Sequence, residues 1–382
     1  MTSRVAFREA SPDELERWDD MTVRAPGGHV LQSKAWAQHR ATRGWQPRFL
    51  VGDDGSGVLA LLRPWPVVGG ASAYLPRGPV PTGGLEDAVA RLEGATRWLA
   101  KQGVDVVASD AEVIADGYAE RLATVGFHSI EEIQPSRHRL SVRLDEHSDE
   151  DKLFENVSKS TRQRIRQAER GGLTVVRYDA APPPPPPARS SALADLEFAN
   201  PVVKPERALE RFHGLASQTA DRRHFALGSR ASFLHWTTRA YASGFLVLLE
   251  AIDEAERSIA GLMLYRHGGR LSTVLSGDLE EARKEHPGAF HLLRWRAIQA
   301  AVREGATEMD LGGVDVAGAR HEPKEGEPMF GLYQHKRGFG AQWVELPGPT
   351  SGSSGRGGTR PAGWPLARCE GVHDRGISRM DI

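Results

Sequence analysis

The most constraining feature of this sequence is an order of predicted elements that occurs twice. In the first half, residues 47–66 contain two apolar runs around Asp-Asp-Gly-Ser-Gly, a pattern typical of a strand hairpin. Residues 85–101 predict a helix that Gly103 ends, and residues 104–110 (VDVVASD) predict a buried strand. A hairpin, a helix and a returning strand therefore follow one another.

The second half repeats this order. Residues 244–277 predict two or three antiparallel strands, 287–305 a helix, and 306–314 a further strand. Both helix–strand junctions, KQGVDVVASD and REGATEMDLGG, place a basic residue and a glycine before a strand that carries an aspartate. The predicted fold class is therefore α/β (α+β), with two tandem units that each contain a mostly antiparallel mixed sheet, flanking helices and a helix–strand crossover.

The expected boundaries place the first unit at 1–146, completed by a strand near 341–346, and the second at 147–340. Residues 182–187 are six consecutive prolines, which predict a stiff polyproline spacer at the surface. Residues 347–382 are rich in Gly, Ser and Pro and contain too few apolar residues for a core, so we expect a disordered tail. We assign no role to the spacer or the tail.

Composition excludes several classes of protein. The 49 basic and 50 acidic side chains give a net charge of −1, so a polyanion site requires local clustering of positive charge. The single cysteine, Cys369, excludes an intramolecular disulfide and a cysteine-based zinc cluster, which fits a reducing compartment. No apolar run approaches the roughly 20 residues of a membrane span. We expect a soluble, cytoplasmic protein, and a peripheral role at the inner membrane face stays open.

A basic helix is predicted over residues 150–172. Its apolar positions lie on one side, and Arg162, Arg166 and Arg170 recur every four residues on the other. Such a face can contact a nucleic-acid backbone. A solvated helix surface is the commoner explanation of a charge run, and both interpretations stay open at this point.

The segment GLYQHKRGFG (331–340) is the strongest local signal for chemistry. Its three glycines allow sharp turns or a close approach of backbone to a ligand, and Lys336 and Arg337 lie between them beside Tyr333. A cation held at such an approach suits a developing oxyanion or a phosphate. The spacing alone favours a basic turn beside a strand, because glycine–lysine loops are common.

Three more residues stand at predicted turns. Arg77 lies in AYLPRGPV (73–80), a rigid turn that either orients the guanidinium toward an anion or is only structural. Asp110 and Asp310 end strands, and capping a turn is a safer assignment for them than orienting a base. The sequence has no HExxH, Walker loop or GxSxG motif, and its histidines lack metal-ligand spacing.

Taken in order along the chain, these segments resemble the motifs of the FemABX-like family, the aminoacyl-tRNA-dependent peptidyltransferases of bacterial cell-wall synthesis. The resemblance extends to about residue 346, and the ordered set is far more specific than any one piece. It rests on VLQSKAWAQHRATRGW (30–45), YLPRGPV (74–80), IQPSRHRLSVRL (133–144), VSKSTRQRIRQAERGGLTV (157–175), FHLLRWRAIQAAVREGATEMDLGGV (290–314) and GLYQHKRGFGAQWVEL (331–346).

The resemblance implies two acetyltransferase-like (GNAT-like) domains in tandem. It implies an enzyme that moves an amino acid from the 3′ ester of an aminoacyl-tRNA to an amine on the stem peptide of a UDP- or lipid-linked peptidoglycan precursor. No metal, organic cofactor or DNA partner is implied. Loop 250–258 is too short for the two-helix coiled arm of long family members, so this chain resembles the short form.

The resemblance also assigns roles to residues. Lys336 matches the family lysine that supports the negative charge of the reaction, and His335 stands where the family usually has Phe. His335 is then either a proton acceptor near the amine or a packing substitute for that ring. The remaining assignments are acceptor contacts by Arg40 (at the diphosphate), Arg77, Arg222, Arg230 and Tyr333, and tRNA contacts by Lys159, Arg162 and Arg166.

Three alternatives accompany this interpretation. The same chemistry could act on a small amine of a peptide-like natural product, which the short form and His335 favour. A CoA-dependent N-acyltransferase predicts a pyrophosphate-binding glycine loop after a strand, and no such loop is convincingly placed. A non-catalytic RNA-binding protein would need only the arginine-rich helix. The sequence does not identify the amino acid transferred or the oligomeric state.

Overall fold

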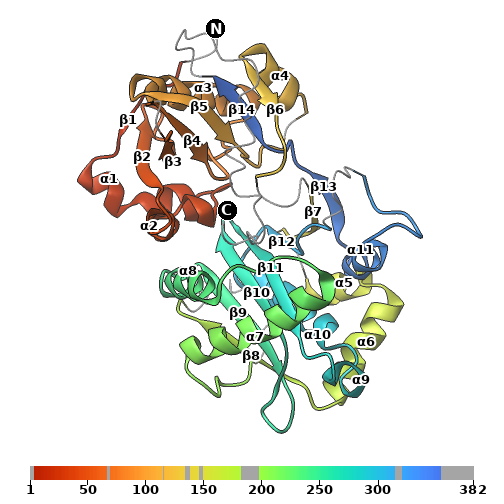
Figure 1. The fold of residues 1–382 in the computed structure, drawn as a ribbon. Helices are drawn as coiled ribbons and strands as arrows, with labels where there is room; N and C mark the ends of the chain where they lie inside the picture. The colour runs from red at the N-terminus through yellow and green to blue at the C-terminus, as the bar shows by residue number, and fades with distance from the viewer. Residues whose placement is uncertain are drawn as a thin grey trace. The chain divides into compact units, whose positions relative to one another are not determined.

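A computed structural model describes residues 4–66, 69–114, 116–133, 138–145, 149–181, 198–314 and 321–353 (Figure 1). These residues form two compact units. The first contains the described residues up to 133 together with 346–353, and the second contains those from 138 to 345. Each unit is built on one seven-stranded sheet and has its own apolar core.

The first sheet has the strand order β1-β2-β3-β4-β5-β14-β6. Its neighbouring strands are antiparallel except β4 and β5, which run parallel because helix α3 (Leu85–Lys101) crosses between them. The bounds are β1 Phe7–Glu9, β2 Gln46–Gly52, β3 Gly57–Pro64, β4 Ala71–Leu75, β5 Val104–Ser109, β14 Thr350–Ser353 and β6 Phe127–Ser129.

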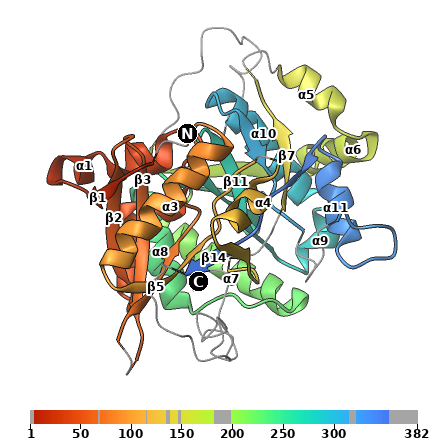
Figure 2. The same cartoon turned by 90° about the horizontal axis from the view of Figure 1, so that it is seen from above.

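Local sequence signals explain the helices of this unit. Ser11 and Glu14 form a capping box at the start of α1 (Pro12–Glu16), and the Ser33 hydroxyl caps α2 (Lys34–Ala41) by accepting from Trp36 N–H at 3.0 Å. Helix α3 lies along the sheet (Figure 2) and buries a stripe of small and branched residues in the core. Short η1 (Asp20–Arg24) and η2 (Val30–Gln32) precede α2, and α4 (Tyr118–Thr124) precedes β6.

The second sheet has the order β13-β7-β12-β11-β10-β9-β8. Only β11 and β12 run parallel, and helix α10 (Ala289–Arg303) lies between them in the chain. This is the same arrangement as in the first unit, so the predicted fold class with its duplicated crossover is confirmed. The strands are β13 Gln342–Glu345, β7 His138–Arg143, β12 Glu308–Asp310, β11 Arg270–Asp278, β10 Ser258–His267, β9 Leu246–Ile252 and β8 Thr174–Asp179.

Helices cover both faces of β8–β11. Side chains alternate along β10, so Leu262 and Leu264 join the core with α6 (Lys159–Arg170) and α10, whereas Gly261 faces α7 (Pro205–Arg223). A Cβ at Gly261 would lie 2.5 Å from the Phe212 ring, so only glycine admits α7 at this distance. The other helices are α5 Glu150–Asn156, α8 Arg230–Ala242, α9 Ala282–Glu285 and α11 Phe330–Arg337.

The boundaries of the two units differ from the expected ones, because two strands belong to the other unit. Strand β13 pairs with β7 in the second sheet, with Gln342 opposite Ser141, and so does not complete the first sheet. Strand β7 itself belongs to the second unit, so the first unit does not extend to residue 146. Strand β13 pairs with a strand about 200 residues earlier in the chain, and the pattern within residues 341–346 does not identify so distant a partner.

The strand that completes the first sheet is β14, which lies inside the predicted disordered tail. It pairs with β5 and β6 on its two sides, so its backbone groups are satisfied although TSGS contains no apolar residue. Gly352 lies so close to the Phe127 ring that a Cβ there would be 2.9 Å away. Residues 354–382, with Cys369, and the proline run 182–187 lie outside the described residues.

The predicted basic helix of residues 150–172 is two helices, α5 and α6. Val157 is extended (ψ 135°), which ends α5, and the Ser158 hydroxyl caps α6 by accepting from Thr161 N–H. The Ser158 cap therefore lies inside the range that the sequence predicts as one helix. Because the chain bends here, Phe154 and Val157 do not share one straight apolar face with Ile165 and Ala168.

Candidate functional site

Lys336 lies in the last turn of α11 rather than in a glycine-bounded loop. The side chain is buried, with 5% of its residue surface exposed, and Nζ donates to Gly313 O at 2.6 Å. Gly313 belongs to the segment that follows β12, so two segments far apart in sequence hold this ammonium in one direction. A buried lysine needs such an acceptor, because a desolvated cation without one is costly.

Among the glycines around Lys336, Gly338 lies at a close contact between two helices. A Cβ at Gly338 would lie 2.4 Å from Thr161 Oγ1 of α6, and Gly338 O accepts from Ser158 N–H at 2.8 Å. Gly340 has a φ of 79° and makes the exit turn. The close backbone approach that the sequence indicated is therefore between the end of α11 and the start of α6.

His335 accepts a hydrogen bond from a buried arginine. Arg294 Nη1 donates to His335 Nε2 at 2.9 Å, and a guanidinium has only donors, so the neutral imidazole carries its proton on Nδ1. Burial, with smaller effects of Arg294, His291 and Lys336, holds the pKa of His335 far below its usual range. The nitrogen that a general base would use is occupied, which argues against His335 as the proton acceptor.

Arg294 itself is an unusual cation. Its side chain lies on the buried stripe of α10, over the Phe290 ring at 5.4 Å, and burial lowers its pKa to about 10. The neighbouring His291 ring lies 4.3 Å from His335, and burial lowers its pKa to about 4. Arg294 is not among the residues that the sequence motifs indicate as functional. The available signal was a basic residue in an otherwise apolar helical stripe.

Tyr333 is buried one helical turn before Lys336, and its hydroxyl donates to Glu322. Burial and then this carboxylate raise the pKa of Tyr333. Arg337 lies over the ring at 5.8 Å. In this structure Tyr333 is therefore engaged with Glu322, and its ring belongs to the packing around α11.

The tRNA candidates fall into two groups. Arg162 Nη1 donates to Phe154 O and Glu155 O, so this arginine caps the end of α5. Lys159 and Arg166 are exposed on the side of α6 opposite its buried residues, together with Arg170. The one acidic residue of α6, Glu169, pairs with Arg296 of α10, and within the described ranges no carboxylate pairs with the three exposed cations.

Two of the arginines expected to contact the acceptor, Arg222 and Arg230, pair with carboxylates. Arg222 pairs with Asp278, which Arg283 also contacts. Although burial opposes the shift, these guanidiniums hold the pKa of Asp278 below its usual range. Arg230, at the start of α8, is exposed and pairs with Glu210 at 3.2 Å. Of the two, Arg230 is the one that a ligand can reach without breaking a buried ion pair.

Arg40 lies in the first unit, on α2. It is 3% exposed, and its guanidinium carbon lies 5.4 Å from the Trp36 ring and 5.1 Å from the Trp45 ring. Stacking against two indoles fixes the plane of the guanidinium. Arg63 of β3 lies over the same Trp45 ring at 5.5 Å, so two positive charges flank one aromatic side chain.

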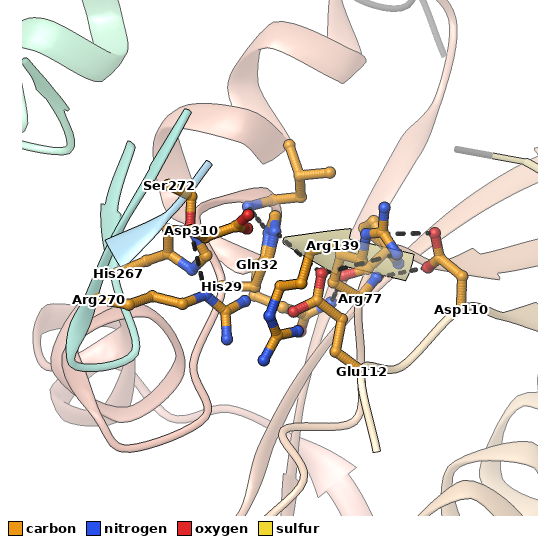
Figure 3. A network of polar contacts seen from close by, with 12 residues as sticks. His29, Gln32, Arg77, Asp110, Glu112, Arg139, His267, Arg270, Ser272 and Asp310 are labelled. Carbon is orange, nitrogen blue, oxygen red and sulfur yellow. Dashed lines mark hydrogen bonds and ion pairs between the residues drawn. The ribbon is translucent and has the colours of Figure 1, made fainter. Parts of the chain in front are cut away.

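Arg77 also lies in the first unit and has a left-handed backbone, with a φ of 53°, before the cis Gly78-Pro79 bond. Its N–H donates to Asp110 Oδ1 at 2.6 Å, and its side chain lies 3.6 Å from Asp110 and 3.7 Å from Glu112 (Figure 3). Asp110 thus caps the turn, as expected. The arrangement orients the guanidinium, but toward carboxylates of its own unit.

The structure brings together one set of the predicted residues. Tyr333, His335 and Lys336 share α11, and the end of α11 contacts the start of α6, where Lys159 lies. Arg222 and Arg230 lie on α7 and α8 of the same unit, and Arg40 and Arg77 belong to the first unit. Among the described residues no three His, Cys, Asp or Glu side chains converge as a metal site.

Comparisons with known proteins agree with this fold. Residues 156–337 match the Acetyltransferase (GNAT) domain family. The crystal structure of FemX aligns with a TM-score of 0.70 and 18% sequence identity, covering 90% of this chain and 96% of FemX. Among curated proteins, no sequence matches this chain significantly.

Two further solved structures share the fold at lower similarity. A conserved protein of unknown function from Bacteroides thetaiotaomicron has a TM-score of 0.53 and 11% identity, covering 91% of this chain and 99% of its own. L-PGS from Bacillus licheniformis has a TM-score of 0.50 and 13% identity, covering 92% and 94%. The fold is thus that of FemX, two GNAT-like units in tandem, which is the fold that the resemblance drawn from the motifs implies.

Proposed function

We propose that this chain, whose fold is acyltransferase-like, is an aminoacyltransferase. It takes an amino acid from an aminoacyl-tRNA and joins it to an amine of a peptidoglycan precursor stem peptide. The observation that carries the proposal is the contact between two helices of the second unit. Helix α11 presents a buried, directed ammonium, and α6 presents a basic face without acidic partners. The motif order and the FemX and L-PGS folds support it.

The reaction is an ester-to-amide exchange. The acceptor nitrogen attacks the carbonyl carbon of the tRNA ester, a C–N bond forms, and the C–O bond to the ribose 3′ oxygen breaks. The departing oxygen takes up the proton that the nitrogen loses, so atoms and charges balance without an added reactant. The ester is already activated, and the remaining demands are to position the amine and to stabilise the tetrahedral oxyanion.

Lys336 is assigned to the oxyanion. The bond from Nζ to Gly313 O fixes the direction of the ammonium. A preorganised donor at a developing charge contributes about 3–4 kcal/mol to transition-state stabilisation. His335 is given no proton-transfer role, because its Nε2 accepts from Arg294. It serves instead to pack against α10 beside Lys336.

The donor tRNA is assigned to the basic face of α6. Lys159 and Arg166 are the proposed phosphate contacts, joined by Arg170, which the same outer face presents. Arg162 is the weakest of the predicted contacts, because its guanidinium already caps α5. Contacts of this kind give affinity that falls as salt rises, since each one releases counterions from the nucleic acid.

The acceptor is assigned to arginines through the resemblance. Arg40 is proposed to contact the diphosphate of the precursor, and its stacking between Trp36 and Trp45 supports a preoriented guanidinium. Arg230, Arg222 and Arg77 are proposed as further acceptor contacts. Arg230 is exposed, whereas the ion pairs of Arg222 and Arg77 are largely buried, so Arg230 is the most accessible of the three to an anion. Tyr333 is proposed to border the transferred amino acid.

A second candidate function is CoA-dependent N-acyl transfer. The match of residues 156–337 to the Acetyltransferase (GNAT) domain family favours it. Under this alternative acetyl-CoA, rather than charged tRNA, is the donor. An acceptor amine on a small peptide-like molecule is compatible with either donor. A cytoplasmic location is proposed with either donor. Among the described helices none has the length and apolarity to span a bilayer.

The test supplies both donors to the purified full chain. Radiolabelled aminoacyl-tRNAs and labelled acetyl-CoA are each mixed with lipid-linked precursor, UDP-linked precursor or small amines, and amide products are measured. We expect product only with charged tRNA, and RNase treatment of the donor should abolish it. Lys336→Ala should remove most turnover, whereas Lys324→Ala, an exposed lysine near α11, should not. RNase-resistant product from acetyl-CoA would establish the second candidate instead.

A further inference from the structure

One face of the second sheet carries a buried polar cluster. Strands β7, β12 and β11 lie side by side, and their apolar residues point into the core with α10. The alternate positions point the other way and are polar although they are buried or half-buried. These residues are Arg139 and Ser141 on β7, Glu308 and Asp310 on β12, and Arg270 and Ser272 on β11. Figure 3 labels Arg139, Asp310, Arg270 and Ser272 among them.

Asp310 is the residue of this cluster that reaches a turn. It stands at the end of β12, opposite Ser141 of β7 and Ser272 of β11. Oδ1 accepts from Gly312 N–H at 2.6 Å, two residues along the chain. Burial raises the pKa of Asp310, and the Arg139 and Arg270 guanidiniums oppose this shift. A carboxylate between two guanidiniums is a strong, fixed acceptor.

The turn after β12 is held at several points besides Asp310. Leu311 N–H donates to Leu140 O at 2.8 Å, and Leu140 N–H donates to Gly312 O at 3.3 Å. Val314 N–H donates to His138 Nε2 at 2.9 Å, and the His138 ring stacks on Trp343 at 3.8 Å. Gly313 lies between these anchors, and its carbonyl accepts from Lys336 Nζ.

Gly312 brings the turn against the ammonium. Its φ of 77° is a conformation that side chains disfavour, and a Cβ built there would lie 3.3 Å from Lys336 Nζ and 3.2 Å from Thr273 O. The hydrogen bond from Gly312 N–H to Asp310 fixes this conformation. The direction of the Gly313 carbonyl, and with it the position of Nζ, therefore depends on Asp310.

We propose that Asp310 is a positioning residue for Lys336: by holding Gly312 N–H it aims the Gly313 carbonyl that fixes the lysine ammonium. The proposal deepens the proposed function, because the kinetic consequence rests on Lys336 acting in aminoacyl transfer. The geometric part does not depend on any substrate, so the two can fail separately.

The geometric test measures how fast an acylating reagent modifies each lysine of the intact full chain, by peptide mass spectrometry. Removing the bond between Asp310 and Gly312 N–H in Asp310→Ala should raise the modification rate of Lys336 about tenfold, as expected for loss of one charge-assisted hydrogen bond. Asp310→Asn keeps an acceptor oxygen and should restore most of the protection. Lys34, whose Nζ donates to Leu15 O and Glu16 O, is the internal control and should not change.

The kinetic test is a double-mutant cycle. Asp310→Ala should lower kcat for amino-acid transfer about 10–100-fold with little change in KM, and should cost nothing further in the Lys336→Ala background. Glu308→Gln is the matched control, since Glu308 is a carboxylate of the same cluster that pairs with Arg139 and does not bond the turn. Its effect should be the same with and without Lys336.

If Asp310→Ala does not fold, as judged by thermal unfolding, Gly312→Ala tests the same turn by placing a methyl group beside Nζ. It should raise Lys336 modification and lower kcat alone. Unchanged Lys336 modification in the folded Asp310 and Gly312 variants would overturn the positioning role. If the variants show faster Lys336 modification but the wild-type protein has no tRNA-dependent activity, the positioning role of Asp310 is retained and the proposed function is overturned.

Discussion

Two aspartates occupy the same place in the two units. Asp110 follows β5 and Asp310 ends β12, and each of these strands runs parallel to its neighbour after the crossover helix. Asp110 is buried and Asp310 is half-buried, and each accepts a backbone N–H at 2.6 Å, from Arg77 and from Gly312. Burial raises the pKa of both carboxyls, against the opposing effect of nearby arginines.

What the two turns hold differs. Asp110 also accepts from the Tyr74 hydroxyl at 2.8 Å, and the side chain of Arg77 returns to the same carboxylate, so this turn is closed on its own residues. The turn held by Asp310 presents its Gly313 carbonyl to a lysine from a later helix. The duplicated fold thus places an aspartate that holds a turn in each unit. Among the described residues, only the turn held by Asp310 forms a hydrogen bond with a buried lysine.

The strongest test of the difference between the two turns is to remove the cation at each one, Lys336 and Arg77. Lys336→Ala should lower kcat for amino-acid transfer by about 10²–10³-fold, because a preorganised donor to the oxyanion is lost. Arg77→Ala should instead raise the KM for the acceptor with only a small change in kcat. Steady-state kinetics with both substrates measure this difference. An equal loss of kcat in both variants would mean that the two turns are not functionally distinct.

Removing Asp110, the carboxylate that holds the turn of the first unit, should lower the stability of the protein and leave the reactivity of Lys336 unchanged. Asp110→Ala leaves Arg77 N–H and the Tyr74 hydroxyl without their acceptor, so it should lower the free energy of unfolding by about 2–3 kcal/mol. Urea denaturation measures this loss. Modification of Lys336 by an acylating reagent should stay at the wild-type rate. A faster rate in the folded variant would show that the two anchors are coupled.

Acid should destabilise the second unit through His335 and His291. Burial lowers the pKa of both imidazoles below the value near 6.5 that they regain on unfolding, so only the unfolded chain takes up their protons. Stability is then complete above about pH 6.5 and falls with pH, by about 2 kcal/mol for each histidine between pH 7 and 5.

Urea midpoints at the two pH values, compared between the wild type and His335→Phe, test this dependence. The variant should lose less stability on acidification. His128→Ala, which removes an exposed histidine of the first unit, is the control and should behave as the wild type. The same acid loss in His335→Phe would contradict a neutral, buried His335.

The smallest expected effect concerns the basic face of α6. Lys159→Glu and Arg166→Glu should each raise the KM for aminoacyl-tRNA about 3–10-fold and lower the slope of log affinity against log salt by about one. The kcat should change little. Lys204→Glu, an exchange at the exposed N-terminal end of α7, serves as the matched control. Equal effects at Lys204 would indicate nonspecific attraction rather than a tRNA contact on α6.

Much of the fold was accessible from the sequence. The hairpins and the crossover helices depend on contacts within a few residues, and the structure has them where the pattern predicts. The ordered motifs of residues 30–346 led to the FemX fold for the same reason, because short segments of defined spacing record local structure.

The sequence did not show which distant segments of the chain pair or pack with one another. Strand β14 has no apolar residue and is defined only by its backbone bonds to β5 and β6, and β13 joined the sheet that the pattern did not assign to it. The hydrogen bond between Arg294 and His335 and the ion pair between Arg222 and Asp278 likewise depend on which elements pack together.

The sequence by itself determined a duplicated α/β chain with a lysine between glycines near its C-terminal end, because periodicity and turn residues act locally. Only the tertiary structure decided that this lysine is buried in a helix and directed by the Gly313 carbonyl. The physical reason is that a hydrogen bond joining residues 313 and 336 depends on how α11 packs against the segment that follows β12, and no spacing in the sequence encodes that distance.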